Sequence, residues 1–363
     1  MEFNKIDLDY RNYTTLKLAG NLLHANEILT FCTKNGSAPY LALRDFVEEW
    51  LHPSPYMSIM TSGSTGKPKV MEVAKNHMLW SASQSAKYFN FQKEQSALLS
   101  LPLTYIAGKM MVVRAFYSQL NLYIQEPKTQ ALQDLPLDIT IDFAPFTPMQ
   151  LDIIPKNVQL PRKVLLGGGP VSKELEDKLQ DFQEEIYHGY GMAETLSHIA
   201  LRRVNGPKRS EIYQAFSSVK LRLDTRNCLC IQLPFQKEEI TTNDIVQMKG
   251  PHSFIWLGRI DNVINTGGIK VFPEDIENKI TVLISCRFFI SSKEDAILGE
   301  KVILILEKNG FTLAEWKILK TQLQSVLSKY EVPKEVYTAN EFIETHSGKI
   351  QREATLKISQ KAI

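Results

Sequence analysis

Cysteine is scarce in this chain of 363 residues. The four cysteines are Cys32, Cys228, Cys230 and Cys286, and only the second and third lie near each other. A disulfide framework needs more cysteines at regular spacing, and a structural zinc site needs a second pair of ligands. We therefore expect reduced thiols, with neither a disulfide scaffold nor a zinc finger.

An excess of charge of either sign is also lacking. Lys and Arg number 42 and Asp and Glu number 40, so the formal net charge is +2. Proteins that bind nucleic acids usually carry a basic excess, and acidic disordered tails carry the opposite one. The composition therefore gives no case for a nucleic-acid partner.

Long apolar runs are absent as well. The apolar segment MMVV is interrupted by Arg114, and VILIL is flanked by charged residues. A helix that crosses a bilayer needs about 20 apolar residues. The first residues, MEFNKIDLDY, lack the basic segment and the apolar run of a signal peptide. We expect no membrane span and a cytoplasmic location.

What the chain has is the composition of a globular protein. Hydrophobic residues make up 44% and charged residues 23%, and the length suits two domains better than one. No internal repeat or low-complexity tract is visible, which excludes solenoids and linker-rich arrays. We expect two compact domains, each with a buried core.

Strand and helix patterns alternate in the first part of the chain. Thr147 and Pro148 mark a helix start, with a hydroxyl cap and a proline in the first turn. The segment SKELEDKLQDF is predicted as a helix that follows a glycine turn. Short apolar runs predict strands, namely LPLDITIDFAP, KVLL and EEIYHGYG. Strand, glycine turn and helix in sequence predict an α/β core with parallel strands.

A domain boundary is predicted near residue 258. Residues 258–272 contain three glycines and break the alternation of strands and helices, as a connector would. We therefore predict a large domain over residues 1–258 and a small one over residues 259–363. Both sizes fit the usual range for domains.

The small domain also shows an α/β pattern. PEDIENKITVL is predicted as a helix, and CRFFISS and KVILILE as strands. A capping box from Thr312 to Glu315 then begins a second helix. Its apolar residues recur at helical spacing until a proline stops the pattern, at Trp316, Leu319, Leu323, Val326, Tyr330 and Pro333.

The strongest chemical signal is a short loop rich in glycine, hydroxyl and lysine side chains. Glycines let several backbone N–H groups turn toward one anion, while hydroxyls and lysines add donors and positive charge. The loop differs from a P-loop in its glycine spacing and in the residue after the first lysine. A flexible Ser/Gly linker is the alternative, but the two lysines favour phosphate binding. The residues are Thr61, Ser62, Gly63, Ser64, Thr65, Gly66, Lys67, Pro68 and Lys69.

Five further motifs follow in order along the chain. They are Gly167 to Pro170, Tyr190-Gly191-Met192-Ala193-Glu194-Thr195, Thr242-Asn243-Asp244, Gly258-Arg259-Ile260-Asp261 and Ser347-Gly348-Lys349-Ile350. With the first loop they resemble the motifs of the adenylate-forming superfamily, which includes acyl-CoA synthetases, firefly-type luciferases and peptide-synthetase adenylation domains. The resemblance covers nearly all of the chain from about residue 55 onward. It implies an α/β fold with a large N-terminal domain, abbreviated at its start, and a small mobile α+β C-terminal domain.

The resemblance implies an ATP site. It assigns the phosphates to the first loop, adenine to the glycine turn and to Tyr190, and the ribose to Asp244, since one carboxylate accepts two hydrogen bonds. From the residues alone, Asp244 is equally a solvated loop aspartate, and Tyr190 a core aromatic. The implied nucleotide-binding residues are Thr61, Ser62, Gly63, Ser64, Thr65, Gly66, Lys67, Gly167, Gly168, Gly169, Tyr190, Gly191, Met192, Asp244 and Arg259.

Three residues are implied to act in catalysis: Lys349, Glu194 and Thr195. Lys349 would lie between the substrate carboxylate and the α-phosphate, where an ammonium group offsets developing charge. Glu194 would hold Mg²⁺, which prefers carboxylate and phosphate oxygens, and Thr195 would contact the phosphates. Without the resemblance, Lys349 is a solvated loop charge and Glu194 a carboxylate at a helix start.

The resemblance also implies a swivel of the small domain. Asp261 is the implied hinge, and Asn262 follows it where the family often has a second acidic residue. One orientation would present Lys349 for adenylation, and another would present Gly267 and Gly268 to the thiol of CoA. ATP, Mg²⁺ and CoA are the implied cofactor and cosubstrates.

The acid substrate is indicated by the segment PLTYIAG and by the segment KMMVVRAF, which follows it. This segment resembles the acyl-pocket lining of o-succinylbenzoate–CoA ligases, in which an arginine at the position of Arg114 is thought to engage the second carboxylate. A charge in such an apolar stretch must be paired, either by a dicarboxylic acid or by an internal Asp or Glu. Tyr105 stands where relatives usually carry histidine, and Ser197 and His198 are implied to line the aromatic-carboxylate end.

The implied function is that of an acid–thiol ligase of menaquinone biosynthesis. It would adenylate 2-succinylbenzoate with ATP and transfer the acyl group to CoA. Three alternatives stay open: a ligase for another aryl or short fatty acid, transfer of the acyl group to a carrier protein, and a non-catalytic nucleotide-binding protein. The oligomeric state is not indicated by the sequence.

Overall fold

The structure is a computed structural model that describes residues 8–61, 69–128, 132, 139–155, 158–344 and 350–363. The chain divides into two compact units. Unit 1 comprises Met1–Val171, Leu175–Val219 and Leu233–Phe235, and unit 2 comprises Ser172–Glu174, Lys220–Gln232 and Gln236–Ile363. The domain boundary expected near residue 258 stays a prediction.

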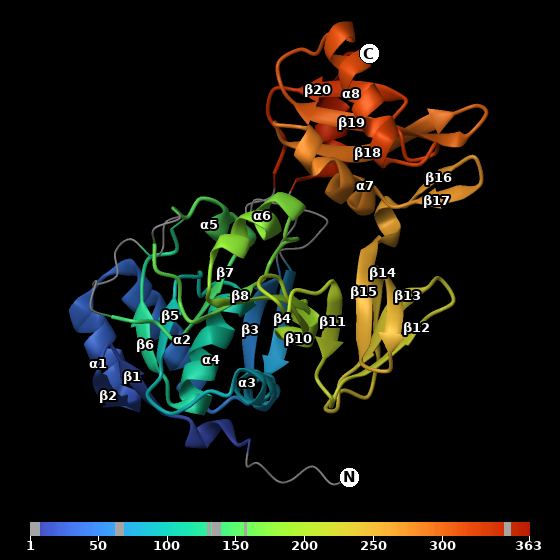
Figure 1. Cartoon of the computed structure of the whole chain (residues 1–363). Helices are drawn as coiled ribbons and strands as arrows, with labels where there is room; N and C mark the ends of the chain where they lie inside the picture. Colours follow the sequence, from blue (N-terminus) through green and yellow to red (C-terminus); the bar gives the residue numbers. More distant parts are fainter. Residues whose placement is uncertain (1–7, 62–68, 129–131, 133–138, 156–157, 345–349) are drawn as a thin grey trace. The chain divides into compact units, whose positions relative to one another are not determined.

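Unit 1 is built on a mixed β-sheet (Figure 1). In spatial order its strands are β11 (Ile212–Ala215), β10 (His198–Arg203), β9 (Glu185–Gly191), β8 (Lys163–Leu166), β7 (Phe143–Phe146), β5 (Ser96–Leu99), β6 (Asn121–Ile124), β1 (Thr15–Leu18) and β2 (Asn21–His24). The pairs from β9 through β1 are parallel. The outer pairs β1–β2, β9–β10 and β10–β11 are antiparallel. The predicted parallel core is confirmed.

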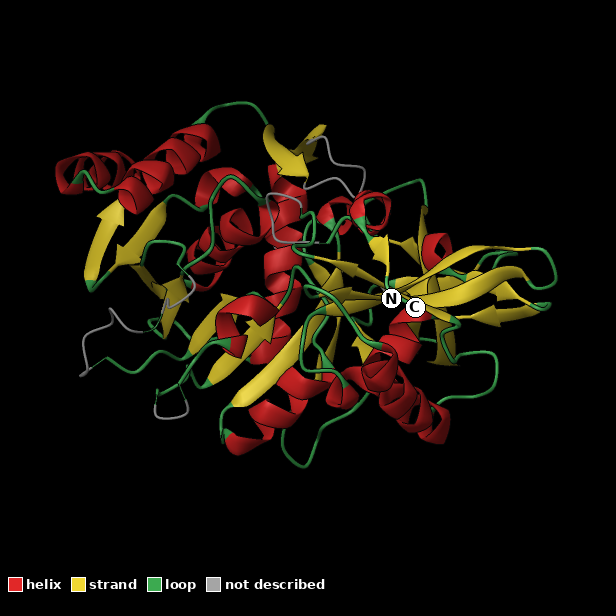
Figure 2. Ribbon diagram, turned by 90° about the horizontal axis from the view of Figure 1, so that it is seen from above, coloured by secondary structure: helices red, strands yellow, loops and turns green. Residues whose placement is uncertain are grey.

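Helices cover both faces of this sheet (Figure 2). On one face Leu151, Leu175 and Leu179 share a core with strand residues of β7, β8 and β9. On the other face the ring of Phe89 packs against Phe143 of β7, with centroids 5.0 Å apart. The described helical segments are η1 (Tyr10–Asn12), α1 (Ala25–Asn35), α2 (Ala38–Leu51), α3 (Lys75–Phe89), α4 (Ile106–Ser118), α5 (Pro148–Asp152), α6 (Lys173–Lys178), η2 (Leu179–Asp181) and η3 (Ala193–Thr195).

Local sequence accounts for the elements that were predicted here. The Thr147 hydroxyl accepts from the N–H of Gln150 (3.3 Å), and the Gln150 side chain accepts from the N–H of Thr147 (2.9 Å), so α5 begins with a capping box. KVLL and EEIYHGYG form β8 and β9 as predicted. LPLDITIDFAP forms a strand only from Phe143, and its residues 135–138 lie outside the described part.

Parallel strands place the functional segments at one edge of the sheet. Because β7, β8 and β9 run parallel, their carboxyl ends meet at the same edge. Thr147, Gly167 and Met192 follow directly after those three strands. Open α/β sheets bind ligands at this edge.

A separate two-stranded hairpin carries the ends of the serine- and glycine-rich loop. It consists of β3 (Tyr56–Thr61) and β4 (Lys69–Ala74), which pair antiparallel. Residues 62–68, between the strands, lie outside the described part. The loop predicted to hold phosphates therefore starts and ends on paired strands.

Unit 2 begins with an antiparallel meander. Its strands are β12 (Lys220–Leu223), β13 (Cys228–Gln232), β14 (Ile240–Gly250) and β15 (Ser253–Arg259). Cys228 and Cys230 lie buried on β13, and all four cysteines of the chain are free thiols.

The rest of unit 2 is an α+β assembly. A sheet in the order β17-β16-β19-β20-β21, with β18 paired to β19, packs against helices. The elements are η4 (Ile260–Asn262), β16 (Ile264–Thr266), β17 (Ile269–Val271), α7 (Pro273–Ile280), η5 (Thr281–Leu283), β18 (Phe288–Asp295), β19 (Gly299–Glu307), α8 (Leu313–Val326), β20 (Glu335–Ala339), α9 (Arg352–Ile358) and β21 (Gln360–Lys361). The predicted capping box, helix 273–283 and two strands are present.

Two predictions for this region were wrong. Residues 258–272 are not a plain connector, because β16 and β17 form a hairpin whose turn places Gly267 at φ 58° and Gly268 at φ 79°. Such a two-residue turn needs positive φ at both central positions, which glycine adopts without strain. Helix α8 ends at Val326 rather than near Pro333, because the N–H of Ser328 donates to Glu331 (2.7 Å) in a separate turn.

Among the described residues, none of the helices combines the length and the apolar character needed to span a bilayer.

Candidate functional site

Arg114 lies inside unit 1 on α4. Its side chain is 1% exposed, and apolar residues surround it in the sequence. Gly108 sets the position of this helix, because a Cβ at that residue would lie 2.3 Å from the carbonyl oxygen of Pro102. The backbone of α4 therefore approaches the preceding loop closely at this residue.

The partners of Arg114 are all neutral. Its Nε donates to Ser85 Oγ (3.1 Å) and its Nη2 to Ser197 Oγ (2.5 Å), with His198 Nδ1 at 3.4 Å. Among the described residues no carboxylate pairs with it, so the alternative of an internal Asp or Glu partner is contradicted there. Burial lowers the pKa of Arg114 to about 10. The guanidinium stays charged at neutral pH, and no carboxylate of the described residues forms an ion pair with it.

His198 completes this cluster on β10. Ser85 Oγ donates to the carbonyl of Ser81 (3.1 Å), so His198 Nε2, at 3.3 Å, donates to Ser85. Nδ1 then accepts from Ser197 Oγ (3.2 Å). Burial holds the pKa of His198 well below its ordinary value, and the charge of Arg114 lowers it further. The imidazole is therefore neutral and leaves Arg114 as the single charge of the cluster.

Ser85 was missed by the sequence analysis. It lies on α3, outside every motif, and the contact to His198 joins residues far apart in the chain. A serine on a buried helix face carries no local signal of ligand binding. Only the tertiary contact identifies it.

Tyr105 lies at the start of the same helix. It is the N-cap residue of α4, and its backbone forms a bridge to Met60, one residue before Thr61. None of the described contacts of Arg114 involves Tyr105. The structure thus places Tyr105 beside the start of the serine- and glycine-rich loop, and its pocket role stays a prediction.

A tight turn connects β9 and β10 and carries the predicted metal and phosphate residues. Thr195 Oγ1 accepts from the N–H of Met192 (2.9 Å) and lies 2.7 Å from the carbonyl of Ser197. Leu196 has φ 68°, which is uncommon for a residue with a branched side chain. Gly191 permits the turn to close, because a Cβ there would lie 2.2 Å from the Ser197 carbonyl oxygen.

The turn places the side chains of Glu194 and Thr195 in different environments. Glu194 is exposed and has no ion pair or hydrogen bond among the described residues, so its carboxylate is available to a cation. The Thr195 hydroxyl is 0% exposed and is used within the turn. The contact of Thr195 with phosphate stays a prediction, while its hydrogen bonds hold the turn that carries Glu194.

The glycine turn after β8 lies at the carboxyl edge of the sheet. Gly168 has φ 83°, and Cβ atoms at Gly167 and Gly169 would meet nothing within 4 Å. The surface of this turn is therefore open backbone, to which a flat ring can approach closely. Tyr190 lies at the end of β9, at the same edge of the sheet.

Asp244, Arg259 and Asp261 come together within unit 2. Asp244 and Arg259 are cross-strand partners on β14 and β15, with Nη1 and Oδ1 4.0 Å apart. Arg259 Nη2 lies 2.7 Å from Asp261 Oδ2, and the Asn243 amide donates to Asp261 at 3.0 Å. The Asp244 side chain is buried and accepts from Trp256 Nε1 (3.2 Å). Asp244 is therefore a fixed acceptor and not a solvated loop residue.

Gly267 and Gly268 form the turn between β16 and β17. A Cβ at Gly267 would lie 3.2 Å from the Tyr330 ring, while one at Gly268 would meet nothing within 4 Å. The hairpin alone explains both glycines, and their contact with CoA stays a prediction.

Several predicted residues lie outside the described part of the chain. They are Ser62, Gly63, Ser64, Thr65, Gly66, Lys67 and Lys349, and nothing is described of the side chain of Thr61.

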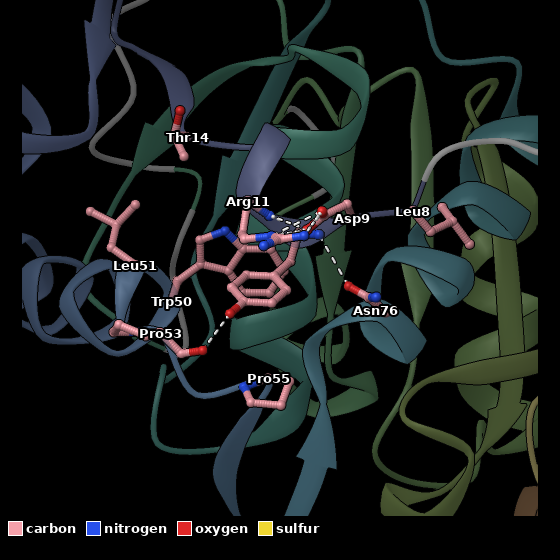
Figure 3. Close-up of a pocket in the computed structure, with 10 residues that line it drawn as sticks. Leu8, Asp9, Arg11, Thr14, Trp50, Leu51, Pro53, Pro55 and Asn76 are labelled. Carbon is pink, nitrogen blue, oxygen red and sulfur yellow. Dashed lines mark hydrogen bonds and ion pairs between the residues drawn. The ribbon is translucent and has the colours of Figure 1, made fainter.

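A cavity of about 970 Å³ lies elsewhere in unit 1 (Figure 3). Tyr10 and Trp50 form part of its wall, and the Tyr10 hydroxyl donates to the carbonyl of Pro53 (2.7 Å). Asp9 and Arg11 at its rim form an ion pair with each other. None of the predicted site residues lines this cavity, so it does not mark the site assembled around Arg114.

The described residues contain no cluster of three or more His, Cys, Asp or Glu side chains arranged to hold a metal ion. Glu194 is a lone carboxylate. This fits Mg²⁺ that takes one or two protein carboxylates and the phosphates of a nucleotide.

A family model described as AMP-binding enzyme matches residues 13–222. The chain belongs to the AMP-binding enzyme family, and it has the adenylate-forming enzyme fold. The predicted superfamily is confirmed.

Individual relatives agree with this assignment. The chain is 26% identical over 343 residues to 2-succinylbenzoate–CoA ligase of Listeria monocytogenes, which covers 84% of this chain and 70% of the relative. The acyl-CoA synthetase (AMP-forming)/AMP-acid ligase II-like protein of Dyadobacter fermentans has a similar structure, with a TM-score of 0.60, 35% identity, and coverage of 90% and 97%. O-succinylbenzoate CoA synthetase of Bacillus subtilis, in complex with its acyl-adenylate intermediate, has a TM-score of 0.70 at 20% identity, with coverage of 84% and 69%.

Proposed function

We propose that this protein is an ATP-dependent acid–CoA ligase that acts on 2-succinylbenzoate. In the first half-reaction a carboxylate oxygen of the acid attacks the α-phosphorus of ATP, which gives the acyl adenylate and releases pyrophosphate. In the second, the thiolate of CoA attacks the acyl carbon and displaces AMP. The product, 2-succinylbenzoyl-CoA, serves menaquinone biosynthesis.

The buried charge of Arg114 is the observation that carries the choice of acid. A buried guanidinium without a counter-ion is costly, and a carboxylate ligand removes that cost through charge-assisted hydrogen bonds. An acid activated at one carboxylate leaves its second carboxylate free to pair with Arg114. 2-Succinylbenzoate is a dicarboxylic acid of this kind, and relatives of this chain carry the name of its ligase.

Ser197 and His198 adapt the cluster to this second carboxylate. The Ser197 hydroxyl lies between the guanidinium and His198, so it can turn its proton toward a carboxylate. The neutral imidazole holds Ser197 and Ser85 in place without a competing charge. Tyr105 would close the pocket from the N-terminal end of α4.

The nucleotide residues are proposed from their positions and from the family. The serine- and glycine-rich loop would bind the phosphates, Gly167–Gly169 and Tyr190 the adenine, and Asp244 the ribose hydroxyls. Glu194 would hold Mg²⁺, which supplies positive charge to the phosphates when bound. Arg259 would orient Asp244 through their close approach.

Lys349, the hinge and the CoA surface complete the proposal. Lys349 would neutralise charge on the α-phosphate during adenylation. Rotation of residues 259–363 about Asp261 would then replace it by the surface around Gly267 and Gly268, where the pantetheine thiol attacks. The contacts of Asp261 with Arg259 and Asn243 would have to change in that rotation.

The test is product formation with a panel of acids. Purified protein is incubated with ATP, Mg²⁺ and CoA, together with 2-succinylbenzoate, benzoate, a short fatty acid or no acid, and thioesters are detected by mass spectrometry. A thioester of 2-succinylbenzoate that depends on ATP supports the proposal. Thioesters of benzoate or fatty acids alone contradict the substrate, and an acyl adenylate that never passes to CoA favours a carrier-protein acceptor.

A further inference from the structure

A buried hydrogen-bond chain lies next to the glycine turn after β8. It begins at His188 of β9, whose Nε2 lies 3.0 Å from the carbonyl oxygen of Gly169. Its Nδ1 lies 2.8 Å from the hydroxyl of Tyr213 on β11. The His188 and Tyr213 side chains are 8% and 7% exposed. No motif of the sequence pointed to either residue.

The chain of partners fixes every proton. A carbonyl oxygen only accepts, so His188 Nε2 carries the hydrogen and donates it to Gly169. Nδ1 is then an acceptor, and the hydroxyl of Tyr213 must donate to it. The guanidinium of Arg202 lies over the ring of Tyr213, 5.5 Å from its centroid, and interacts with the phenol electrostatically.

Arg202 is held in turn by Glu176 of α6. The two side chains form an ion pair, and Arg209 pairs with the second oxygen of Glu176 at 2.8 Å. Burial, and next the charge of Arg202, lower the pKa of His188 to about 3. His188 therefore stays neutral, in the tautomer that donates to Gly169.

This arrangement fixes the glycine turn at both ends. The turn leads from β8 into α6, so Arg202 holds its far end through Glu176 while His188 holds Gly169. Cβ atoms at Gly167 and Gly169 would meet nothing within 4 Å, so no neighbouring side chain packs against these two residues on that side. The hydrogen bond from His188 is the one described side-chain bond to these glycines.

Tyr213 also contacts Tyr190, the other residue expected at the adenine. Their ring centroids lie 5.9 Å apart in an edge arrangement. One residue thus orients His188 with its hydroxyl and supports Tyr190 with its ring.

We propose that His188 and Tyr213 are positioning residues of the nucleotide site, which hold the turn at Gly169 and the ring of Tyr190 in the geometry that binds the adenine of ATP. This inference rests on the proposed function, because it assumes that adenine lies against these two elements. The acid cluster around Arg114 shares none of these hydrogen bonds.

The test compares three variants with wild-type protein by calorimetric titration with a non-hydrolysable ATP analogue and Mg²⁺. His188→Leu removes the donor to Gly169, Tyr213→Phe removes the hydroxyl but keeps the ring, and His188→Gln keeps an N–H donor near the position of Nε2. Tyr187→Phe, which removes a hydroxyl bound to Glu185 on the same strand, is the matched control.

We expect His188→Leu and Tyr213→Phe to weaken binding of the analogue by about tenfold, the effect of one lost hydrogen bond, and His188→Gln and Tyr187→Phe to stay near wild type. In steady-state assays the KM for ATP should rise while kcat and the KM for the acid change little. Unchanged affinity for the analogue in both His188→Leu and Tyr213→Phe overturns the inference. Equal losses in all three variants, with lowered melting temperatures, show a purely structural role and also overturn it. Absence of binding to wild-type protein overturns the proposed function itself.

Discussion

Replacement of Arg114 by methionine tests whether the charge of this residue serves ligand binding or the stability of the fold. Burial lowers the pKa of Arg114 from 12.5 to about 10, which corresponds to a cost of about 3 kcal/mol in the absence of acid. Its hydrogen bonds to Ser85 and Ser197 stabilise the folded protein by a similar free energy, about 1.5 kcal/mol each. Methionine fills comparable space, and it brings neither the cost of a buried charge nor the stabilisation from these hydrogen bonds. We therefore expect the free energy of unfolding of Arg114→Met to differ from wild type by less than about 1 kcal/mol.

Activity should respond very differently. Loss of the partner of a buried carboxylate costs about 3 to 5 kcal/mol. We therefore expect kcat/KM for 2-succinylbenzoate to fall at least about 100-fold. Adenylation of an analogue that lacks the ring carboxylate should not fall.

The assay is pyrophosphate release with both acids, together with urea unfolding of each protein without ligand. Lys109→Met is the matched control, because Lys109 is a second buried charge on α4 but pairs with Glu49 at 2.9 Å. It should lower stability and leave the preference between the acids unchanged. A loss of more than about 3 kcal/mol of stability in Arg114→Met, the cost expected for breaking a structural ion pair, would refute the reasoning. Equal loss of activity on both acids would refute it as well.

Three further predictions follow from the same geometry. Gly191→Ala should displace the Ser197 carbonyl, which a Cβ would approach to 2.2 Å, and lower the melting temperature and activity together; wild-type values for both would contradict the tight turn. The folded-state pKa of His188 is about 3, so between that value and about 6.5 the unfolded chain binds a proton that the folded chain refuses. Stability should therefore fall by about 2 kcal/mol from this residue between pH 7 and pH 5, and urea unfolding of His188→Gln should show that much less dependence on pH; the same slope as wild type would contradict it. Lys349→Ala should remove most adenylation but spare thioester formation from supplied acyl adenylate, as measured by mass spectrometry; equal loss of both steps would contradict its role.

Local sequence signals predicted the elements whose capping and periodicity are self-contained. Thr147 forms its capping box with a residue three positions away, so the start of α5 was visible in the sequence. The hairpin of β16 and β17 was not, because its strands span three residues each and are too short to show alternation. The end of α8 was misplaced for a related reason, since helical spacing continues to Tyr330 although the backbone leaves the helix after Val326.

The site residues likewise fall into those that the sequence indicated and those that it did not. Arg114 was identified through the resemblance of its segment to an acyl-pocket lining, since a charge in an apolar stretch left an internal carboxylate partner equally open. The structure shows that its hydrogen-bond partners are neutral. Ser85 and Tyr213 were not found, because each acts through a partner distant in the chain. A single hydroxyl on a helix or strand has no local feature that reports such a partner.

The central claim is that the protein couples ATP cleavage to a dicarboxylic acid through Arg114. The most direct measurement is pyrophosphate release by wild-type protein with ATP and Mg²⁺, with 2-succinylbenzoate compared to its analogue without the ring carboxylate. We predict rapid release that depends on 2-succinylbenzoate and a much smaller kcat/KM for the analogue. Equal rates with both acids, or no release that depends on acid, would contradict the account.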